Sequence, residues 1–473
     1  MIRPLKQAGA NRLQTVSPVD GTVYVERPLQ GWKEVDAALN RAKAAWRNWR
    51  ESPLADRQSI VLKALDWMVA NAQAIGEELT WQMGRPIRHS PNEILRGFQE
   101  RVRHTVKLAP KALADIVPPD RPAGLKRYVR REPLGVVAVI APWNYPYLTS
   151  VNSIVPALLT GSVVVLKHSQ QTPLAADRYV AAFTAAGLPE GVFQRLDLSH
   201  ENTLRLMADP RVDHVNFTGS VEGGHAVQRA IGGRFIDAGL ELGGKDPAYV
   251  RADADMQHTV ENLVDGSFFN SGQSCCGIER IYVHEKVYKT FVDAFVDRTL
   301  QYKLGDPTDP AVNLGPMVRT AAAQSVRRQI AQAVRKGAKP LIDERKFPAS
   351  KPRTPYLAPQ VLVNVDHSMS IMMEETFGPA VGIMKVRSDE EALRWINDSP
   401  YGLTASLWTA DVDAAEALGR RIDAGTVFLN RCDYVDPGLP WSGVKDTGRG
   451  AALSVVGFER LTRPKSFHLR TRL

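Results

Sequence analysis

The chain has 473 residues, of which 44% are hydrophobic and 23% are charged, so it is long enough for two or three globular domains. Its net charge of +9 is spread along the sequence, and this disfavours nucleic-acid binding. Three cysteines are too few for a disulfide framework, and no apolar run approaches the roughly 20 residues of a membrane span, so we expect a cytoplasmic protein with neither a nucleic-acid nor a membrane partner.

The first part of the chain has helical periodicity, most clearly over residues 35–46 and 59–79. From residue 121 the pattern becomes extended and is interrupted by Pro and Gly.

The middle of the chain alternates short apolar runs with helical segments. Runs at 136–140 and 163–166 predict strands that are buried on both faces, and the helical segment 174–186 follows the second run. Further strands are predicted at 193–198 and 212–217. This alternation predicts βαβ units and a mostly parallel sheet.

A second α/β pattern begins after the double glycine at 243–244, which marks a candidate domain boundary. Its predicted elements are helices at 255–268 and 285–300, strands at 280–283, 382–386 and 426–429, and an extended basic tail at 464–473.

Two of the three cysteines, Cys275 and Cys276, stand side by side behind the Gly272-Gln273 turn that ends the predicted helix 255–268. A thiol on a loop held by a rigid helix is a common way to present a nucleophile. A thiol that only packs is expected within a strand or on the apolar stripe of a helix. This segment alone leaves a catalytic cysteine and a buried structural thiol both open.

Asn144 follows the predicted strand 136–140, at the end where parallel sheets bind ligands. Its amide N–H groups could stabilise an oxyanion, or the side chain could simply cap a turn.

Ser220 lies between a predicted strand and a helix, where it could bind a pyrophosphate or act as a plain N-cap. Glu241 precedes Cys275 by 34 residues. A carboxylate near an apolar site can have a raised pKa and accept a proton from water, whereas the common role of a lone Glu is a salt bridge.

Five segments, in this order, resemble the signature blocks of the NAD(P)-dependent aldehyde dehydrogenase superfamily. They are Pro-Trp-Asn-Tyr-Pro at 142–146, Phe-Thr-Gly-Ser at 217–220, Glu-Leu-Gly-Gly-Lys at 241–245, Phe-Phe-Asn-Ser-Gly-Gln-Ser-Cys-Cys at 268–276, and Glu-Glu-Thr-Phe-Gly-Pro at 374–379. The resemblance covers essentially the whole chain and implies an α/β fold with a Rossmann-type cofactor domain, an α/β catalytic domain and a small β oligomerisation arm. The implied boundaries are 1–114 and 135–240 for the NAD(P)-binding domain, 241–440 for the catalytic domain, and 115–134 with 441–473 for the arm and C-terminal segment.

The resemblance implies that Cys275 attacks the aldehyde carbon, while Asn144 and the backbone N–H of Cys275 stabilise the oxyanion. The aldehyde is then oxidised to a carboxylic acid through a thiohemiacetal and a thioester, which Glu241 hydrolyses as general base. The presence of Glu241 favours a non-acylating enzyme over a coenzyme A-dependent one.

The implied cofactor is NAD, with NADP left open. Lys167 would contact the adenosine side. Gln170 stands where many NAD-preferring relatives carry a glutamate, and this removes a negative charge that repels a 2′-phosphate. The other implied cofactor-binding residues are Trp143, Gly219, Ser220, Gly224, Leu242, Glu375 and Phe377, and no metal is implied.

The resemblance places four residues along the substrate tunnel: Tyr145, Phe269, Ser274 and Trp441. The three aromatics are similar to part of the cage that betaine-aldehyde and aminoaldehyde dehydrogenases use for a cationic amine, and Asp433 and Asp436 could add attraction. The cage is incomplete, because Asn152 stands where those enzymes often have Trp. An apolar tunnel for aromatic or aliphatic aldehydes is an equal alternative.

Semialdehyde dehydrogenases need an Arg for the distal carboxylate. Ser153 and Asn270 stand at the two matching positions, which argues against that class, although Arg431 is a nearby cation. A non-catalytic structural or binding relative is a further alternative, which predicts damage at the three catalytic positions, and these are intact. The final strand of the family returns to the arm, so we expect a homodimer or homotetramer.

Overall fold

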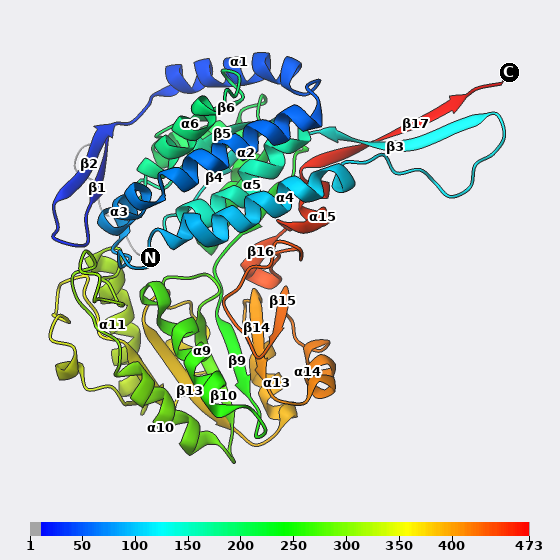
Figure 1. Ribbon diagram of the computed structural model, residues 1–473. Coiled ribbons are helices and arrows are strands. Elements are labelled where there is room, and N and C mark those ends of the chain that lie inside the picture. The colour runs from blue at the N-terminus through cyan, green and yellow to red at the C-terminus, as the bar shows by residue number, and fades with distance from the viewer. Residues whose placement is uncertain (1–10, 473) are drawn as a thin grey trace.

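The computed structural model describes residues 11–472 and consists of two α/β lobes, one above the other in Figure 1. The upper lobe contains a six-stranded sheet and the lower lobe a seven-stranded sheet. The chain passes from the upper sheet to the lower one between residues 241 and 246. The predicted α/β fold with mostly parallel sheets is confirmed.

The upper sheet has the strand order β16-β8-β7-β4-β5-β6, and its pairings are parallel except for that of β16 with β8. Its strands are β4 (Val136–Ile140), β5 (Val163–Lys167), β6 (Phe193–Arg195), β7 (His214–Thr218), β8 (Ala238–Glu241) and β16 (Gly448–Arg449). Every residue of β4 and β5 is buried, as expected of parallel strands that are covered on both faces.

Helices surround this sheet. They are α1 (Trp32–Trp49), α2 (Leu54–Ala70), α3 (Ala72–Met83), α4 (Gln99–Ala112) with a π-helical turn at Glu93–Phe98 before it, α5 (Pro146–Thr160), α6 (Leu174–Ala185), α7 (His200–Ala208), α8 (Val221–Ile231) and α15 (Ser454–Arg460). The helical pattern predicted over 59–79 is divided between α2 and α3. Asn71 separates them with φ −104° and ψ 10°, and its Nδ2 donates to the carbonyl of Trp67 at 2.7 Å, which satisfies a group at the end of α2.

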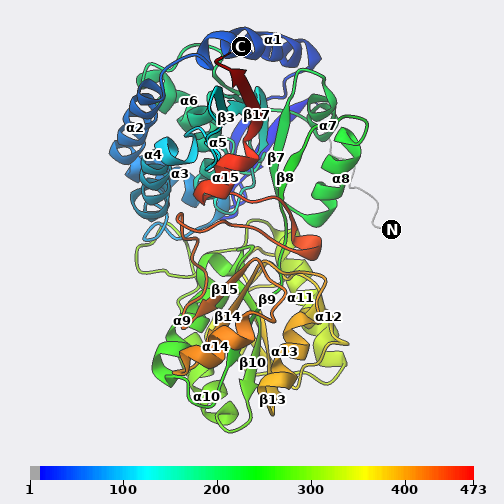
Figure 2. The ribbon, with the colours of Figure 1, turned by 90° about the vertical axis from the view of Figure 1, so that its right-hand side faces the viewer.

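The lower sheet has the order β11-β12-β13-β10-β9-β14-β15 and is parallel except at β11 (Figure 2). Its strands are β9 (Asp246–Val250), β10 (Ile278–His284), β11 (Lys339–Pro340), β12 (Gln360–Val363), β13 (Ala380–Val386), β14 (Thr404–Trp408) and β15 (Thr426–Leu429). Its helices are α9 (Met256–Phe268), α10 (Tyr288–Thr299), α11 (Thr320–Arg335), α12 (Ser370–Met373), α13 (Asp389–Asn397) and α14 (Val412–Gly419).

Two antiparallel ribbons lie outside these sheets. The strands β1 (Arg12–Val16) and β2 (Val23–Pro28) form a hairpin at the edge of the upper lobe (Figure 1). The other ribbon pairs β3 (Leu125–Pro133) with β17 (Thr462–Arg470) and extends away from both lobes. Across residues 11–472, every helix is too short or too polar to cross a bilayer.

The carboxyl ends of the upper strands lie level with one another. Ile140 at the end of β4 pairs with Lys167 of β5 on one side and with Phe217 of β7 on the other. The segments that follow these strands, which contain Asn144 and Ser220, therefore emerge at one edge of the sheet. This is the edge at which open parallel sheets bind ligands.

The cysteine loop begins where α9 ends and has an unusual backbone. Asn270, Ser271 and Gly272 are successively left-handed, with φ of 53°, 57° and 68°. A non-glycine residue in this region costs about 1–3 kcal/mol. A Cβ on Gly272 would lie 2.4 Å from the carbonyl oxygen of Gly378, so only glycine fits where the loop packs against the 374–379 segment. Tertiary packing thus holds the loop in a strained shape.

Candidate active site

A cavity of about 780 Å³ lies at the carboxyl edge of the upper sheet and is bordered by residues of both lobes. Its volume is in the range of cofactor and small-molecule sites. Nine predicted site residues line it: Trp143, Asn144, Lys167, Gly219, Ser220, Leu242, Cys275, Glu375 and Phe377. The structure therefore gathers the predicted nucleophile, the oxyanion donor and most of the predicted cofactor contacts around one space.

Asn144 is connected directly to the cysteine loop. Its Nδ2 donates to the carbonyl of Gln273 at 3.2 Å, and Nδ2 of Asn270 donates to the carbonyl of Asn144 at 3.2 Å. A primary amide has two N–H groups, so Asn144 retains one donor for an oxygen in the cavity. Cys275, half-buried, lines the same cavity, and this arrangement allows the two residues to act on one carbonyl group.

Arg85 and Glu93, which the sequence did not single out, form a buried ion pair behind Asn144. Arg85 also donates to the carbonyl of Asn144 and, at 3.3 Å, to Oδ1 of Asn270. Its guanidinium lies over the ring of Tyr145, 4.6 Å from the centroid. The guanidinium thus fixes the end of β4 and the cysteine loop relative to each other.

The two adjacent cysteines have different surroundings. The Sγ of Cys276 is buried and donates to Oδ1 of Asp433 at 2.9 Å, and Ser274 Oγ lies 3.4 Å from the same oxygen. A neighbouring Cys275 thiol, burial and the Asp433 carboxylate together raise the pKa of Cys276 well above its usual value. Burial raises the pKa of Asp433 to about 7. Cys276 is therefore held as a thiol, and Cys275 is the cysteine that lines the cavity.

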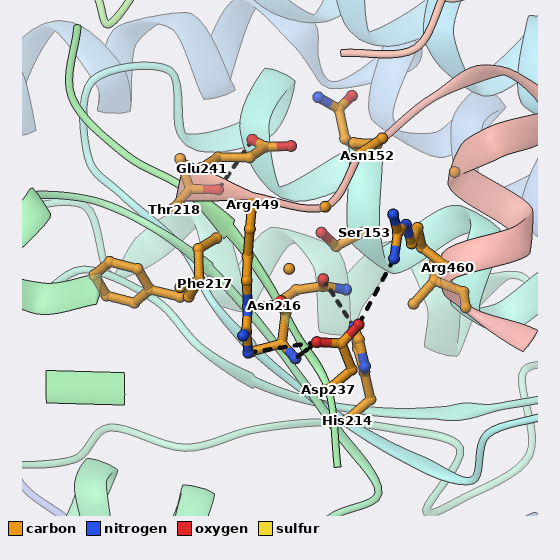
Figure 3. A pocket seen from close by; sticks show the side chains of 18 residues that line it. Asn152, Ser153, His214, Asn216, Phe217, Thr218, Asp237, Glu241, Arg449 and Arg460 are labelled. Carbon is orange, nitrogen blue, oxygen red and sulfur yellow. Dashed lines mark hydrogen bonds and ion pairs between the residues drawn. The ribbon is translucent and has the colours of Figure 1, made fainter. Parts of the chain in front are cut away.

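Glu241 does not line the large cavity. Its side chain borders a second cavity of about 30 Å³ (Figure 3), and its Oε2 accepts a hydrogen bond from Thr218 Oγ1 at 3.2 Å. This volume suits one or two water molecules, and polar groups of Asn152 and Ser153 also border it. Phe217 and Thr218 line both cavities and form a wall between them. The Glu241 carboxyl group therefore lies on the far side of this wall from the large cavity.

Burial raises the pKa of Glu241 to about 7, while the Thr218 hydroxyl and the charge of Arg101 act in the opposite direction. A carboxyl group with this pKa exchanges a proton with water near neutral pH, as a general base must.

Glu375 and Phe377 are positioned by a second buried ion pair. Lys245 Nζ lies 2.6 Å from Glu279, whose two carboxylate oxygens accept the backbone N–H groups of Thr376 and Phe377, each at 2.8 Å. Oε1 of Glu375 accepts the N–H of Gly244 at 3.0 Å, and burial raises the pKa of Glu375 to about 7. Lys245 belongs to a recognised sequence block, but its pairing with a residue 34 positions away was not predicted.

The remaining predicted cofactor residues differ in position. Ser220 caps α8, with its Oγ accepting the N–H of Gly223 at 3.2 Å, so both roles weighed for it fit the site. Gly224 lies in α8, where a Cβ would be 2.6 Å from Leu242, and it permits close packing without lining the cavity. Gln170 also lies outside the lining, and its Nε2 donates to the carbonyl of Leu198 at 3.1 Å. Burial lowers the pKa of Lys167 to about 8.

The four predicted tunnel residues lie outside the large cavity, around the two cysteines and the loop before them. Tyr145 packs on Arg85, and Phe269 meets His89 edge-on at 5.3 Å. Trp441 is buried in a small cluster with Cys276, Leu403 and Leu453. In the described part of the chain, no three His, Cys, Asp or Glu side chains gather in a way that would hold a metal ion.

Comparison with known proteins adds an independent finding. Residues 5–467 match the aldehyde dehydrogenase family. An NADP(+)-type succinate-semialdehyde dehydrogenase of Mycobacterium avium is 33% identical over 465 residues, which cover 96% of both chains.

Two solved structures show the same fold. An indole-3-acetaldehyde dehydrogenase in complex with NAD⁺ has a TM-score of 0.92 and 30% identity, covering 98% of this chain and 94% of the other. An NADP-dependent glyceraldehyde-3-phosphate dehydrogenase of Bacillus halodurans in complex with NADP also has a TM-score of 0.92 and 30% identity, with coverages of 98% and 96%. With this match over nearly its whole length, the chain belongs to the aldehyde dehydrogenase family.

Proposed function

We propose that the protein oxidises a small aldehyde to a carboxylic acid with NAD or NADP, and that Cys275 is the nucleophile. The observation that carries the proposal is that Cys275 and the free amide donor of Asn144 line one cavity of cofactor size. The same cavity presents a helix N-terminus at Ser220 and the buried carboxyl of Glu375.

Each residue has a defined part in the proposed reaction. Cys275 attacks the aldehyde carbon, and the oxygen of the thiohemiacetal is held by Asn144 and by the backbone N–H of Cys275. A nicotinamide held beside Phe377 and Trp143 would supply the acceptor for the hydride of that carbon, and Cys275 would then carry a thioester. Glu241 takes a proton from water, which attacks the thioester and releases the acid. For this step the Glu241 carboxylate must turn from Thr218 towards the thioester, because it lies in the neighbouring cavity.

The residues of the large cavity fit a dinucleotide. The N–H groups at the start of α8 suit a pyrophosphate, and Lys167 supplies a cation beside the strand end. Phe377 and Trp143 meet edge-on at 5.6 Å and form an aromatic wall for the nicotinamide end. Solved relatives hold NAD⁺ in one case and NADP in another, which supports use of either cofactor.

Replacing Cys275 with Ala should lower aldehyde-dependent NADH or NADPH production by at least about 10³-fold, because the reacting sulfur is lost. Cofactor binding, measured by fluorescence titration, should persist. Cys276→Ala is the matched control and should retain activity within about tenfold, since the Cys276 thiol contacts Asp433 and Ser274 and does not line the large cavity. Normal turnover by Cys275→Ala would contradict the assignment.

Turnover should decrease as the pH is lowered through about 7, because the Glu241 base is active as a carboxylate. Thr218→Val removes the hydroxyl that stabilises this carboxylate, so its pKa should rise and the acidic limb of the kcat profile should move up by about one pH unit. Thr218→Ser keeps the hydroxyl and serves as the control. An unchanged limb in Thr218→Val would exclude Glu241 as the titrating group.

We further propose a homodimer or homotetramer assembled through the β3–β17 ribbon and a cytoplasmic location. A two-stranded ribbon is marginally stable alone, and its edges offer unpaired backbone groups to another chain. The rings of Tyr128 and Phe467 stack at 4.6 Å on this largely exposed ribbon. The free thiols of all three cysteines favour a reducing compartment.

Light scattering should give two or four times the mass of one chain for the full-length protein. Deletion of residues 464–473 should shift the mass towards the monomer, because it removes most of β17. A full-length monomer, or a truncated protein with unchanged mass, would contradict assembly through this ribbon.

A further inference from the structure

Arg101 is a buried cation that the proposed reaction does not use. It lies in α4 with 8% of its surface exposed. Its Nη1 donates to the carbonyl of Leu148 and, at 3.2 Å, to Oδ1 of Asn152. Both partners belong to α5, the helix that follows Asn144. The guanidinium is therefore held in a fixed position on the side of the site formed by α4 and α5.

The charge of Arg101 is not neutralised by an ion pair. Among residues 11–472 no carboxylate lies within 4.0 Å of its guanidinium nitrogens, and its two bonded partners are neutral oxygens. Among the described residues, Nε and Nη2 of Arg101 have no hydrogen-bond partner. Both nitrogens retain some accessible surface, so a bound group could reach them. A buried guanidinium without a carboxylate in contact is unfavourable, and the Glu241 and Glu93 carboxyls act on Arg101 only at longer range, which is a reason to expect a bound anion.

Arg101 lies close to the reacting groups. Its charge acts on the carboxyls of Glu241 and Glu93 and on the thiols of Cys276 and Cys275. Asn152, which Arg101 bonds, borders the small cavity. Asn152 and Glu241 lie at the same end of that cavity in Figure 3. A group bound by the free nitrogens of Arg101 would therefore lie on the α4–α5 side of the site, beside the Asn152 amide that borders the small cavity.

The other charged groups near the cysteines already have partners. Arg85 is paired with Glu93, and Arg431 is exposed and stacks on the ring of Tyr434 at 3.5 Å from its centroid. Asp433, the carboxylate that could attract a substrate ammonium, accepts the thiol of Cys276. Apart from Glu241, whose carboxylate is the proposed base, and the thiol-bonded Asp433, the charge without an ion pair in this region is that of Arg101, which favours an anionic substrate over a cationic one.

We propose that Arg101 binds the distal carboxylate of the substrate, so that the enzyme acts on short aldehydes with an acidic group at the other end. This assignment rests on the proposed role of Cys275 as the nucleophile. It locates the cation for such a substrate on α4, away from Ser153 and Asn270, the positions that match the Arg of semialdehyde dehydrogenases.

The test compares kcat/KM for succinic semialdehyde, which carries a distal carboxylate, with that for pentanal, a neutral aldehyde of similar length. Wild-type enzyme should prefer succinic semialdehyde by at least about tenfold. Arg101→Met should raise the KM for succinic semialdehyde by about 10- to 100-fold, because a charge-assisted contact is lost. The KM for pentanal should change little, with both substrates measured well above pH 7 so that Glu241 stays a carboxylate without the Arg101 charge. Arg101→Lys should recover part of the preference. Arg103→Met, at an exposed position on the same helix, is the matched control and should change neither substrate.

Three results would overturn the proposal. Equal losses for both aldehydes in Arg101→Met would make Arg101 a positioning residue for Glu241 or the cysteine loop. Wild-type preference for pentanal, or for the cationic aminobutyraldehyde, would exclude a carboxylate site and needs no variant. Absence of turnover by the wild-type enzyme with every aldehyde would instead refute the proposed function itself.

Discussion

The active-site arrangement depends on one buried ion pair, Arg85 with Glu93. Glu93 accepts the backbone N–H groups of Tyr147 and Leu148 at 2.8 and 3.1 Å, and so binds the first turn of α5. Arg85 contacts the carbonyl of Asn144 on one side and the cysteine loop on the other. Removal of one partner from a buried pair typically costs about 3–5 kcal/mol, because the other charge is left without compensation. The pair therefore holds Asn144, the proposed oxyanion donor, and the loop of Cys275, the proposed nucleophile, at a fixed separation, although the two come from different lobes.

A second buried pair, Lys245 with Glu279, has the same role on the cofactor side. It holds the backbone of Thr376 and Phe377, and the same segment supports the strained turn at Gly272 through the carbonyl of Gly378. Two buried charges thus maintain a loop whose left-handed residues would relax if they were unsupported. This support leaves Cys275 in the cavity while Cys276 faces Asp433.

Local patterns in the sequence predicted the framework well. The runs at 136–140 and 163–166 are apolar because both faces of β4 and β5 are buried. These two strands could therefore be predicted from the sequence alone. The candidate catalytic and cofactor residues, such as Asn144 and Cys275, stand in contiguous blocks, and the resemblance of these blocks to the family's signature segments singled them out.

Contacts between distant segments could not be predicted in this way. Arg85 meets Asn270 across 185 residues, and Arg101 meets Asn152 across 51, without any local pattern that links them. The position of Glu241 behind Thr218 is likewise a matter of side-chain orientation, which sequence spacing does not specify. Arg101, the charge that we propose for the substrate carboxylate, was not predicted because it lies on a helix outside every recognised block.

The central claim is that Cys275 carries the acyl group and that Glu241 releases it. Mass spectrometry of Glu241→Gln after incubation with succinic semialdehyde and NADP tests both parts at once, because the thioester should accumulate when the base is absent. We predict one acyl adduct per chain, located on the peptide that contains Cys275 and absent from Cys275→Ala. An adduct on Cys276, or none while the cofactor is still reduced, would contradict the account.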